Sequence, residues 1–161
     1  MPPILPDLPA LHLSPSEGWK DYQLLDSGDG KTLERFGPYL FIRPEPQCLW
    51  PKAKPELWKK AHAQRVEENK EYGGRWNQLL PMEKSWEMGY GPLRFQCKVS
   101  TSRHLGVFPE QSSHWDWIMQ RVPKGHKPFK VLNLFGYTGL ATLAASAAGA
   151  EVTHVDSSKH A

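Results

Sequence analysis

The sequence has 161 residues, a length that fits one ordinary domain or a small domain with a piece of another. Its hydrophobic fraction of 39%, with seven tryptophans and six phenylalanines, excludes a disordered chain. The net charge is +3, and no apolar run approaches the roughly 18 residues that would span a membrane. The first residues also lack the basic and apolar blocks of a signal peptide, so we expect a cytoplasmic protein without membrane contact.

The sequence contains two cysteines, Cys48 and Cys97, which lie far apart in the chain. Neither has a nearby cysteine at the spacing of metal ligands, so neither a disulfide framework nor a metal site is indicated. We therefore expect two buried free thiols.

The charge is unevenly distributed along the chain. Residues 51–105 carry 11 basic and 6 acidic side chains, whereas residues 1–50 carry 4 basic and 7 acidic ones. A partner that bears phosphates is therefore expected to meet the middle of the chain, although a mixed, solvated surface is an alternative.

Five prolines between residues 1 and 18 favour an extended arm. From Trp19 to Ile42, short apolar runs separated by glycine and proline predict a β-meander. A proline at position 55 and a loose apolar stripe then predict a helix over about 55–70, which Gly73 and Gly74 would end.

The next elements are predicted from alternation and helical spacing. Residues 93–99 alternate between apolar and polar side chains, which indicates a strand. Trp76 and Trp86 are expected to pack in the sheet, with stacking on nucleic-acid bases as the alternative. Residues 111–121 predict a short helix, which a loop at 123–128 follows, and the side chains expected to point inward from this helix are Trp115, Ile118 and Met119.

The chain changes character at Lys130. A compact apolar run is typical of a strand buried on both faces of a parallel sheet, and it leads into a turn from Gly136 to Gly139. A helix rich in alanine and leucine follows, Gly149 is placed to cap it, and a second strand ends at Asp156. This is one βαβ unit, in which the turn and the acid are expected to face the same crevice.

The spacing within this unit indicates which nucleoside ligand it suits. A carboxylate at the position of Asp156 can accept hydrogen bonds from the hydroxyls of an adenosine ribose. Dinucleotide sites use G-x-G-x-x-G, because the pyrophosphate lies against bare backbone amides. The turn here has only Gly136 and Gly139, with Tyr137 and Thr138 between them, so it is a poor pyrophosphate site.

Three segments resemble the class I S-adenosylmethionine-dependent methyltransferases that modify bases of large-subunit ribosomal RNA. They are the run from Val131 to Gly139, the run from Val155 to Ala161, and the earlier segment from His104 to Gln111 followed by Trp115, Asp116 and Trp117. This resemblance covers about the last 60 residues. It implies an α/β fold in which a Rossmann-like methyltransferase domain begins with its first βαβ unit.

The resemblance also implies a cofactor, S-adenosyl-L-methionine, and a set of residues that line its site. In this family the turn after the first strand surrounds the cofactor, the acid that ends the second strand holds the ribose, and an upstream segment covers the methionine end. Asn133 replaces the acid common at the end of the first strand. The expected cofactor-binding residues are Phe108, Gln111, Asn133, Phe135, Gly136, Tyr137, Thr138, Gly139 and Asp156.

We expect a proline-rich arm at 1–18, a small β-rich α+β substrate-binding domain at 19–105, and an incomplete methyltransferase domain at 106–161. Ribosomal RNA is the expected substrate. The catalytic segment of the family has no counterpart in these residues, so no catalytic residue is assigned and the 161-residue chain is expected to be inactive. Leu140, Leu143 and Ala147 are expected to lack part of their packing.

Plainer interpretations stay open at this point. The glycines can serve only a tight turn, Asp156 can cap a following helix, and Gln111 can simply start one. His114 and His154 are expected to be structural. Two other functions also fit: an NAD(P)-dependent oxidoreductase built on the same βαβ start, and a non-enzymatic RNA-binding module in residues 19–105.

Overall fold

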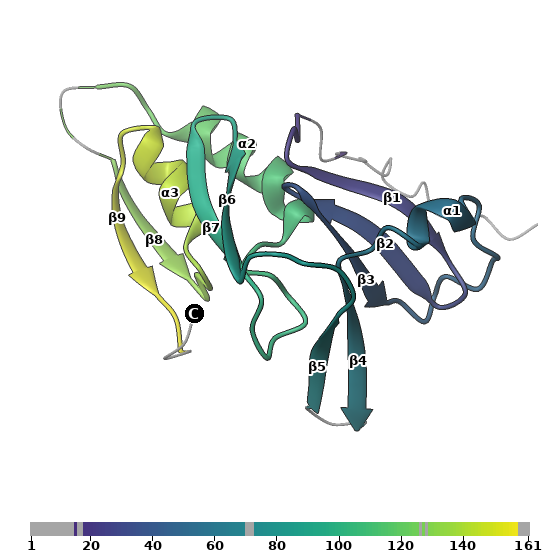
Figure 1. Cartoon of the computed structure of the whole chain (residues 1–161). Coiled ribbons are helices and arrows are strands. Elements are labelled where there is room, and N and C mark those ends of the chain that lie inside the picture. The colour runs from purple at the N-terminus through teal and green to yellow at the C-terminus, as the bar shows by residue number, and fades with distance from the viewer. Residues whose placement is uncertain (1–14, 16–17, 70–72, 126, 128, 158–161) are drawn as a thin grey trace, which may run out of the picture.

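A computed structural model of the chain describes residues 15, 18–69, 73–125, 127 and 129–157. The arm predicted at 1–18 lies almost entirely outside the described residues, and so do residues 158–161 of the second matching segment. Within the described ranges the protein is a mixed α/β structure with three separate sheets (Figure 1). No helix in these ranges is long and apolar enough to cross a membrane.

The predicted β-meander is confirmed. Strands β1 (Tyr22–Gly28), β2 (Lys31–Phe36) and β3 (Tyr39–Pro44) pair antiparallel in chain order. Asp29 and Gly30 join the first two strands with φ angles of 50° and 72°. These positive values are those of the two-residue turn that best matches the twist of a hairpin.

The helix predicted over 55–70 is wrong for most of its length. Only α1 (Pro55–Trp58) is helical, and the chain then enters strand β4 (Ala63–Asn69). Gly73 and Gly74 do not end a helix, because they begin strand β5 (Gly73–Gln78). These two strands form a hairpin that projects from the rest of the sheet (Figure 1).

The reason for this difference lies in the burial pattern after α1. Ala61, Ala63 and Arg65 are buried, and the residues between them are less so, which is the period of two that a strand requires. β4 pairs in parallel with β3, and His62 exchanges hydrogen bonds with the backbone of Leu40 on β3. Pairing with an existing sheet therefore overrides the helical propensity of this segment.

A second, two-stranded sheet consists of β6 (Ser85–Tyr90) and β7 (Leu93–Lys98). The strand predicted over 93–99 is thus confirmed. Trp86 is buried and stacks on Phe41 with the ring centroids 5.5 Å apart, and Trp76 is half-buried. Both tryptophans pack in the sheets as expected.

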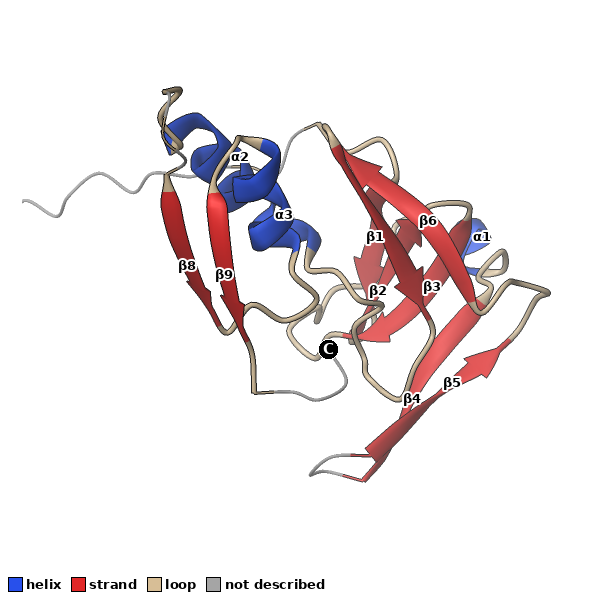
Figure 2. Cartoon of the chain, turned by 90° about the vertical axis from the view of Figure 1, so that its left-hand side faces the viewer, coloured by secondary structure: helices blue, strands red, loops and turns tan. Residues whose placement is uncertain are grey.

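The carboxyl-terminal part contains the βαβ unit. Strands β8 (Lys130–Leu134) and β9 (Glu151–Val155) are parallel neighbours, and α3 (Leu140–Ala147) connects them. Figure 2 shows both strands running in the same direction, with α3 and the preceding helix α2 (Ser112–Arg121) on one side of them. The strand, helix and strand predicted here are all confirmed, as is the short helix predicted over 111–121.

The face of this small sheet that points away from α3 is uncovered within the described residues. Leu132 is 61% exposed and Leu134 is 54% exposed, so β8 is not buried on both faces as the sequence predicted. Leu143 and Ala147 are exposed, as predicted. Leu140 differs from the prediction because it packs into the main core and is only 6% exposed.

One hydrophobic cluster joins the two parts of the molecule. It contains Phe36 and Phe41 from the meander, and also Trp115 from α2 and Ala144 from α3. The boundary predicted between residues 105 and 106 stays a prediction, and this core continues across it. Both cysteines are buried free thiols, as predicted.

Candidate functional site

The turn between β8 and α3 is bound directly to the end of β9. The backbone N–H of Gly136 donates to the carbonyl of Val155 at 3.0 Å. The N–H of Tyr137 donates to Oδ2 of Asp156 at 2.7 Å. The carboxylate that follows the second strand therefore lies against the glycine turn, where parallel strands bring such groups together.

Two aromatic residues in this turn adopt a left-handed backbone conformation. The φ angle is 56° at Phe135 and 50° at Tyr137, and Gly139 follows at 94°. Side chains larger than hydrogen destabilise this conformation by about 1–2 kcal/mol per residue. Strained backbone of this kind clusters at functional sites, where surrounding contacts hold it in place.

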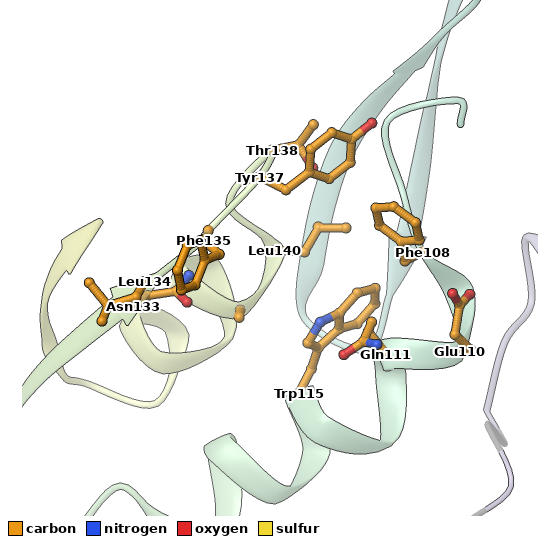
Figure 3. Close-up of a pocket in the computed structure, with 12 residues that line it drawn as sticks. Phe108, Glu110, Gln111, Trp115, Asn133, Leu134, Phe135, Tyr137, Thr138 and Leu140 are labelled. Atoms are coloured by element: carbon orange, nitrogen blue, oxygen red, sulfur yellow. The ribbon is translucent and has the colours of Figure 1, made fainter. Parts of the chain in front are cut away.

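A pocket of about 490 Å³ opens between this turn and the start of α2 (Figure 3). Small-molecule sites occupy roughly 300–1,000 Å³, so the pocket is large enough for a ligand of that class. Residues from two separate stretches of the chain line it, and these are Phe108, Glu110, Gln111, Trp115, Asn133, Leu134, Phe135, Gly136, Tyr137, Thr138, Leu140 and Ala141.

Seven of the nine predicted cofactor-binding residues line this pocket. The other two do not: Gly139 is buried at the start of α3, and Asp156 is hydrogen-bonded to the backbone of Tyr137. The residues that sequence reasoning missed are Glu110, Trp115, Leu134, Leu140 and Ala141. The sequence contained a signal for Glu110, because this acidic residue lies between Phe108 and Gln111, which were both predicted to bind the cofactor.

The segment before α2 packs on the turn through aromatic rings. His104 lies 4.2 Å from the ring of Phe108, and Phe108 lies edge-on to Tyr137 at 5.1 Å. The hydroxyl of Thr138 also donates to the carbonyl of Gly106 at 2.7 Å. Burial raises the pKa of Tyr137. This wall of the pocket is therefore apolar, and the contacts within it hold the turn in its strained form.

His104 is held neutral in this wall. Its Nδ1 atom is buried and has no hydrogen-bond partner in the described part of the chain. Burial, followed by the positive charges of Arg43 and Arg103, lowers the pKa of His104 from 6.5 to about 4. A charged imidazole in this position would lose its hydration and be repelled by the two arginines, so the wall is most stable when His104 is uncharged.

The opposite wall contains a short chain of polar side chains. The amide of Asn133 donates to the hydroxyl of Thr142 at 2.9 Å, and that hydroxyl lies 2.9 Å from Nδ1 of His154. His154 is exposed, and its structural role stays a prediction. His114 likewise contacts Gln111 at the start of α2, at 2.7 Å.

The described residues do not provide a set of metal ligands. Among the residues that the structure describes, no group of three or more histidine, cysteine, aspartate or glutamate side chains is placed to hold a metal ion. The pocket is instead built from backbone, aromatic rings and a few polar groups, which is the usual composition of a small-molecule site.

No family model matches the chain, and no curated protein matches it. Solved structures do. The crystal structure of a SAM-dependent methyltransferase from Agrobacterium tumefaciens is 44% identical over 89% of the chain, with a TM-score of 0.82. A putative enzyme of this class from Streptococcus mutans is 15% identical with a TM-score of 0.61, which shows likeness of fold.

A third match is SMU.776, a putative methyltransferase complexed with SAH, at 16% identity and a TM-score of 0.61. The chain covers 46% of the Agrobacterium protein and 40% of each of the other two. It therefore spans about half the length of the solved structures that it matches.

Proposed function

We propose that the chain forms part of an S-adenosylmethionine-dependent methyltransferase and that the turn after β8 holds the cofactor. The observation that carries this proposal is the hydrogen bond from Tyr137 N–H to Asp156, which brings the acid and the turn to one place. The similarity of sequence and fold to the Agrobacterium enzyme supports it.

The residues present fit this cofactor chemically. The turn carries no pyrophosphate-binding glycine pattern, and S-adenosylmethionine contains no phosphate. Asp156 would accept hydrogen bonds from the ribose hydroxyls, because a carboxylate offers about four acceptor positions and several donors can share it. Phe108 and Trp115 provide apolar surface on the side of the pocket that faces the turn.

S-adenosylmethionine, when bound, supplies an activated methyl group on a sulfonium. The contribution of this chain is to position the cofactor, and positioning dominates reactions whose reactants are already activated. Asp156 would orient the ribose, and Phe135, Gly136 and Tyr137 would place backbone against the methionine arm. The aromatic wall from His104 to Tyr137 would exclude water from one side.

Calorimetry of the 161-residue chain tests the cofactor proposal. We expect saturable binding of S-adenosylhomocysteine, titrated to millimolar concentration, and no binding of NAD under the same conditions. Binding of NAD alone would favour an oxidoreductase and contradict the proposal. Binding is expected to be weak, and methyl transfer absent, because the apolar face of β8 and β9 is uncovered within the described residues. Robust methyl transfer would contradict that expectation.

Ribosomal RNA is the substrate that we propose. The support is the basic middle of the chain, where residues 51–105 carry a net charge of +5. Arg94 and Lys98 are exposed on the outer face of β7, and Arg75 is exposed on β5. Filter binding with large-subunit ribosomal RNA should give an affinity that falls steeply with salt. Binding that is absent at low salt would contradict an RNA substrate.

A further inference from the structure

Among the described residues that line the pocket, Glu110 alone has a carboxylate side chain, and none of them is a lysine, an arginine or a histidine. A positively charged group of a ligand would therefore be attracted to one point on the pocket wall, and that point is Glu110. Figure 3 shows this residue on one side of the pocket and Asn133 on the other.

The backbone around Glu110 is firmly anchored. Glu110 lies in the short helix η1 (Pro109–Gln111), between Pro109 and Ser112, which are both fully buried. The indole N–H of Trp19 lies 3.1 Å from the carbonyl of Pro109 and 3.1 Å from the hydroxyl of Ser112. The carboxylate is thus carried by a segment that is held on both sides, as a preorganised binding group requires.

The end of β8 offers no comparable charge. Asn133 is neutral, and its amide nitrogen is engaged with Thr142 at 2.9 Å. An amide gains far less from a cationic ligand group than a carboxylate does, because hydrogen bonds between charged partners are about twice as strong. Among the described side chains that line the pocket, the negative charge therefore lies on η1 and not at the end of β8.

We propose that Glu110 binds the α-ammonium group of the cofactor's methionine moiety. This inference rests on the proposed function, because it assumes that S-adenosylmethionine occupies the pocket. It assigns Glu110 a role in binding and positioning the cofactor. It also explains how the ammonium group can be bound although position 133 carries a neutral asparagine. Glu110 accepts the hydrogen bond, and the ammonium donates it.

The test compares S-adenosylhomocysteine with its analogue in which hydrogen replaces the α-amino group. In the unmodified protein, we expect the analogue to bind roughly tenfold or more weakly, because a hydrogen bond to a charged group is lost. In Glu110→Gln, the two ligands should bind with nearly equal affinity. Glu110→Asp, which keeps the charge on a shorter side chain, should retain part of the difference.

A matched control is Glu87→Gln, which removes an exposed carboxylate from β6, outside this pocket. This variant should show the same loss of affinity for the analogue, relative to S-adenosylhomocysteine, as the unmodified protein. An equal penalty in Glu110→Gln and the unmodified protein would overturn the inference and leave the proposed function standing. Selective loss of the preference for S-adenosylmethionine over S-adenosylhomocysteine would place Glu110 at the sulfonium and also overturn it. Failure of the unmodified protein to bind either ligand would overturn both.

Discussion

His104 links the pocket wall to the acidity of the solution. The pKa of His104 is lowered from 6.5 to about 4 by burial and by two neighbouring arginines. The folded protein therefore binds a proton at this site less readily than the unfolded chain does. Its contribution to stability is complete above pH 6.5 and is lost as the pH falls toward 4.

Replacement of His104 by phenylalanine should remove this dependence. A phenyl ring keeps the contact with Phe108, which lies 4.2 Å from the imidazole, and it cannot be protonated. Urea unfolding between pH 7 and pH 4 is expected to show a shallower loss of stability in His104→Phe than in the unmodified protein. His114→Phe alters an exposed histidine on α2 and should leave the loss unchanged. Identical pH profiles for His104→Phe and the unmodified protein would contradict the assignment.

At the scale of elements, the parts most predictable from sequence were those with strong local signals. The meander has turn residues at each bend, and α3 has an alanine-rich run that ends at Gly149. The helix predicted after Pro55 is wrong for most of its length, because the residues there favour a helix and only pairing with β3 makes the segment a strand. Single-sequence patterns do not contain that tertiary contact.

The end of α3 shows how closely a local signal can fix an element. Gly149 has a φ angle of 97°, and its N–H donates to Ser146 while that of Ala150 donates to Ala145. This pair of bonds is the Schellman pattern, which satisfies carbonyls at a helix end.

Gly149→Ala should lower the free energy of unfolding by about 1 kcal/mol. No atom lies within 4 Å of the position of the added methyl group, so the loss comes from the backbone alone. Urea denaturation measures it, with Gly125→Ala as the control, because Gly125 has similar space and no positive φ angle. An equal effect in both variants would contradict this account of the cap.

At the scale of the whole molecule, one core unites the β-rich part and the βαβ unit. Phe41 is fully buried in this core, together with side chains from α2 and α3. The sequence predicts two consecutive units, because the residues that resemble a methyltransferase begin near residue 104 and the chain changes character at Lys130. It did not reveal a shared core, because a core depends on contacts between residues distant in the chain. The turn that lines the pocket could be predicted from the sequence. The opposite wall, with Glu110 and Trp115, was harder to predict, because it meets the turn only through contacts between residues distant in the chain.

Phe41→Ala should therefore destabilise both parts together, by about 3–5 kcal/mol. Tryptophan fluorescence and far-ultraviolet circular dichroism should follow one shared unfolding transition, shifted to lower urea. Leu24→Ala removes a side chain that is 52% exposed and should change stability by less than about 0.5 kcal/mol. Two separated transitions in the unmodified protein would show that the parts fold independently.

The central claim is that Asp156 and the turn after β8 form one ligand site. The most direct test compares the effects of replacing two acidic residues, one at each end of β9. Asp156 follows β9 beside the turn, and Glu151 begins β9 at its other end, where it is exposed. In calorimetric titrations with S-adenosylhomocysteine, Asp156→Asn should bind roughly tenfold or more weakly than the unmodified protein, and Glu151→Gln should bind equally well. Equal affinity for Asp156→Asn and the unmodified protein would contradict the account.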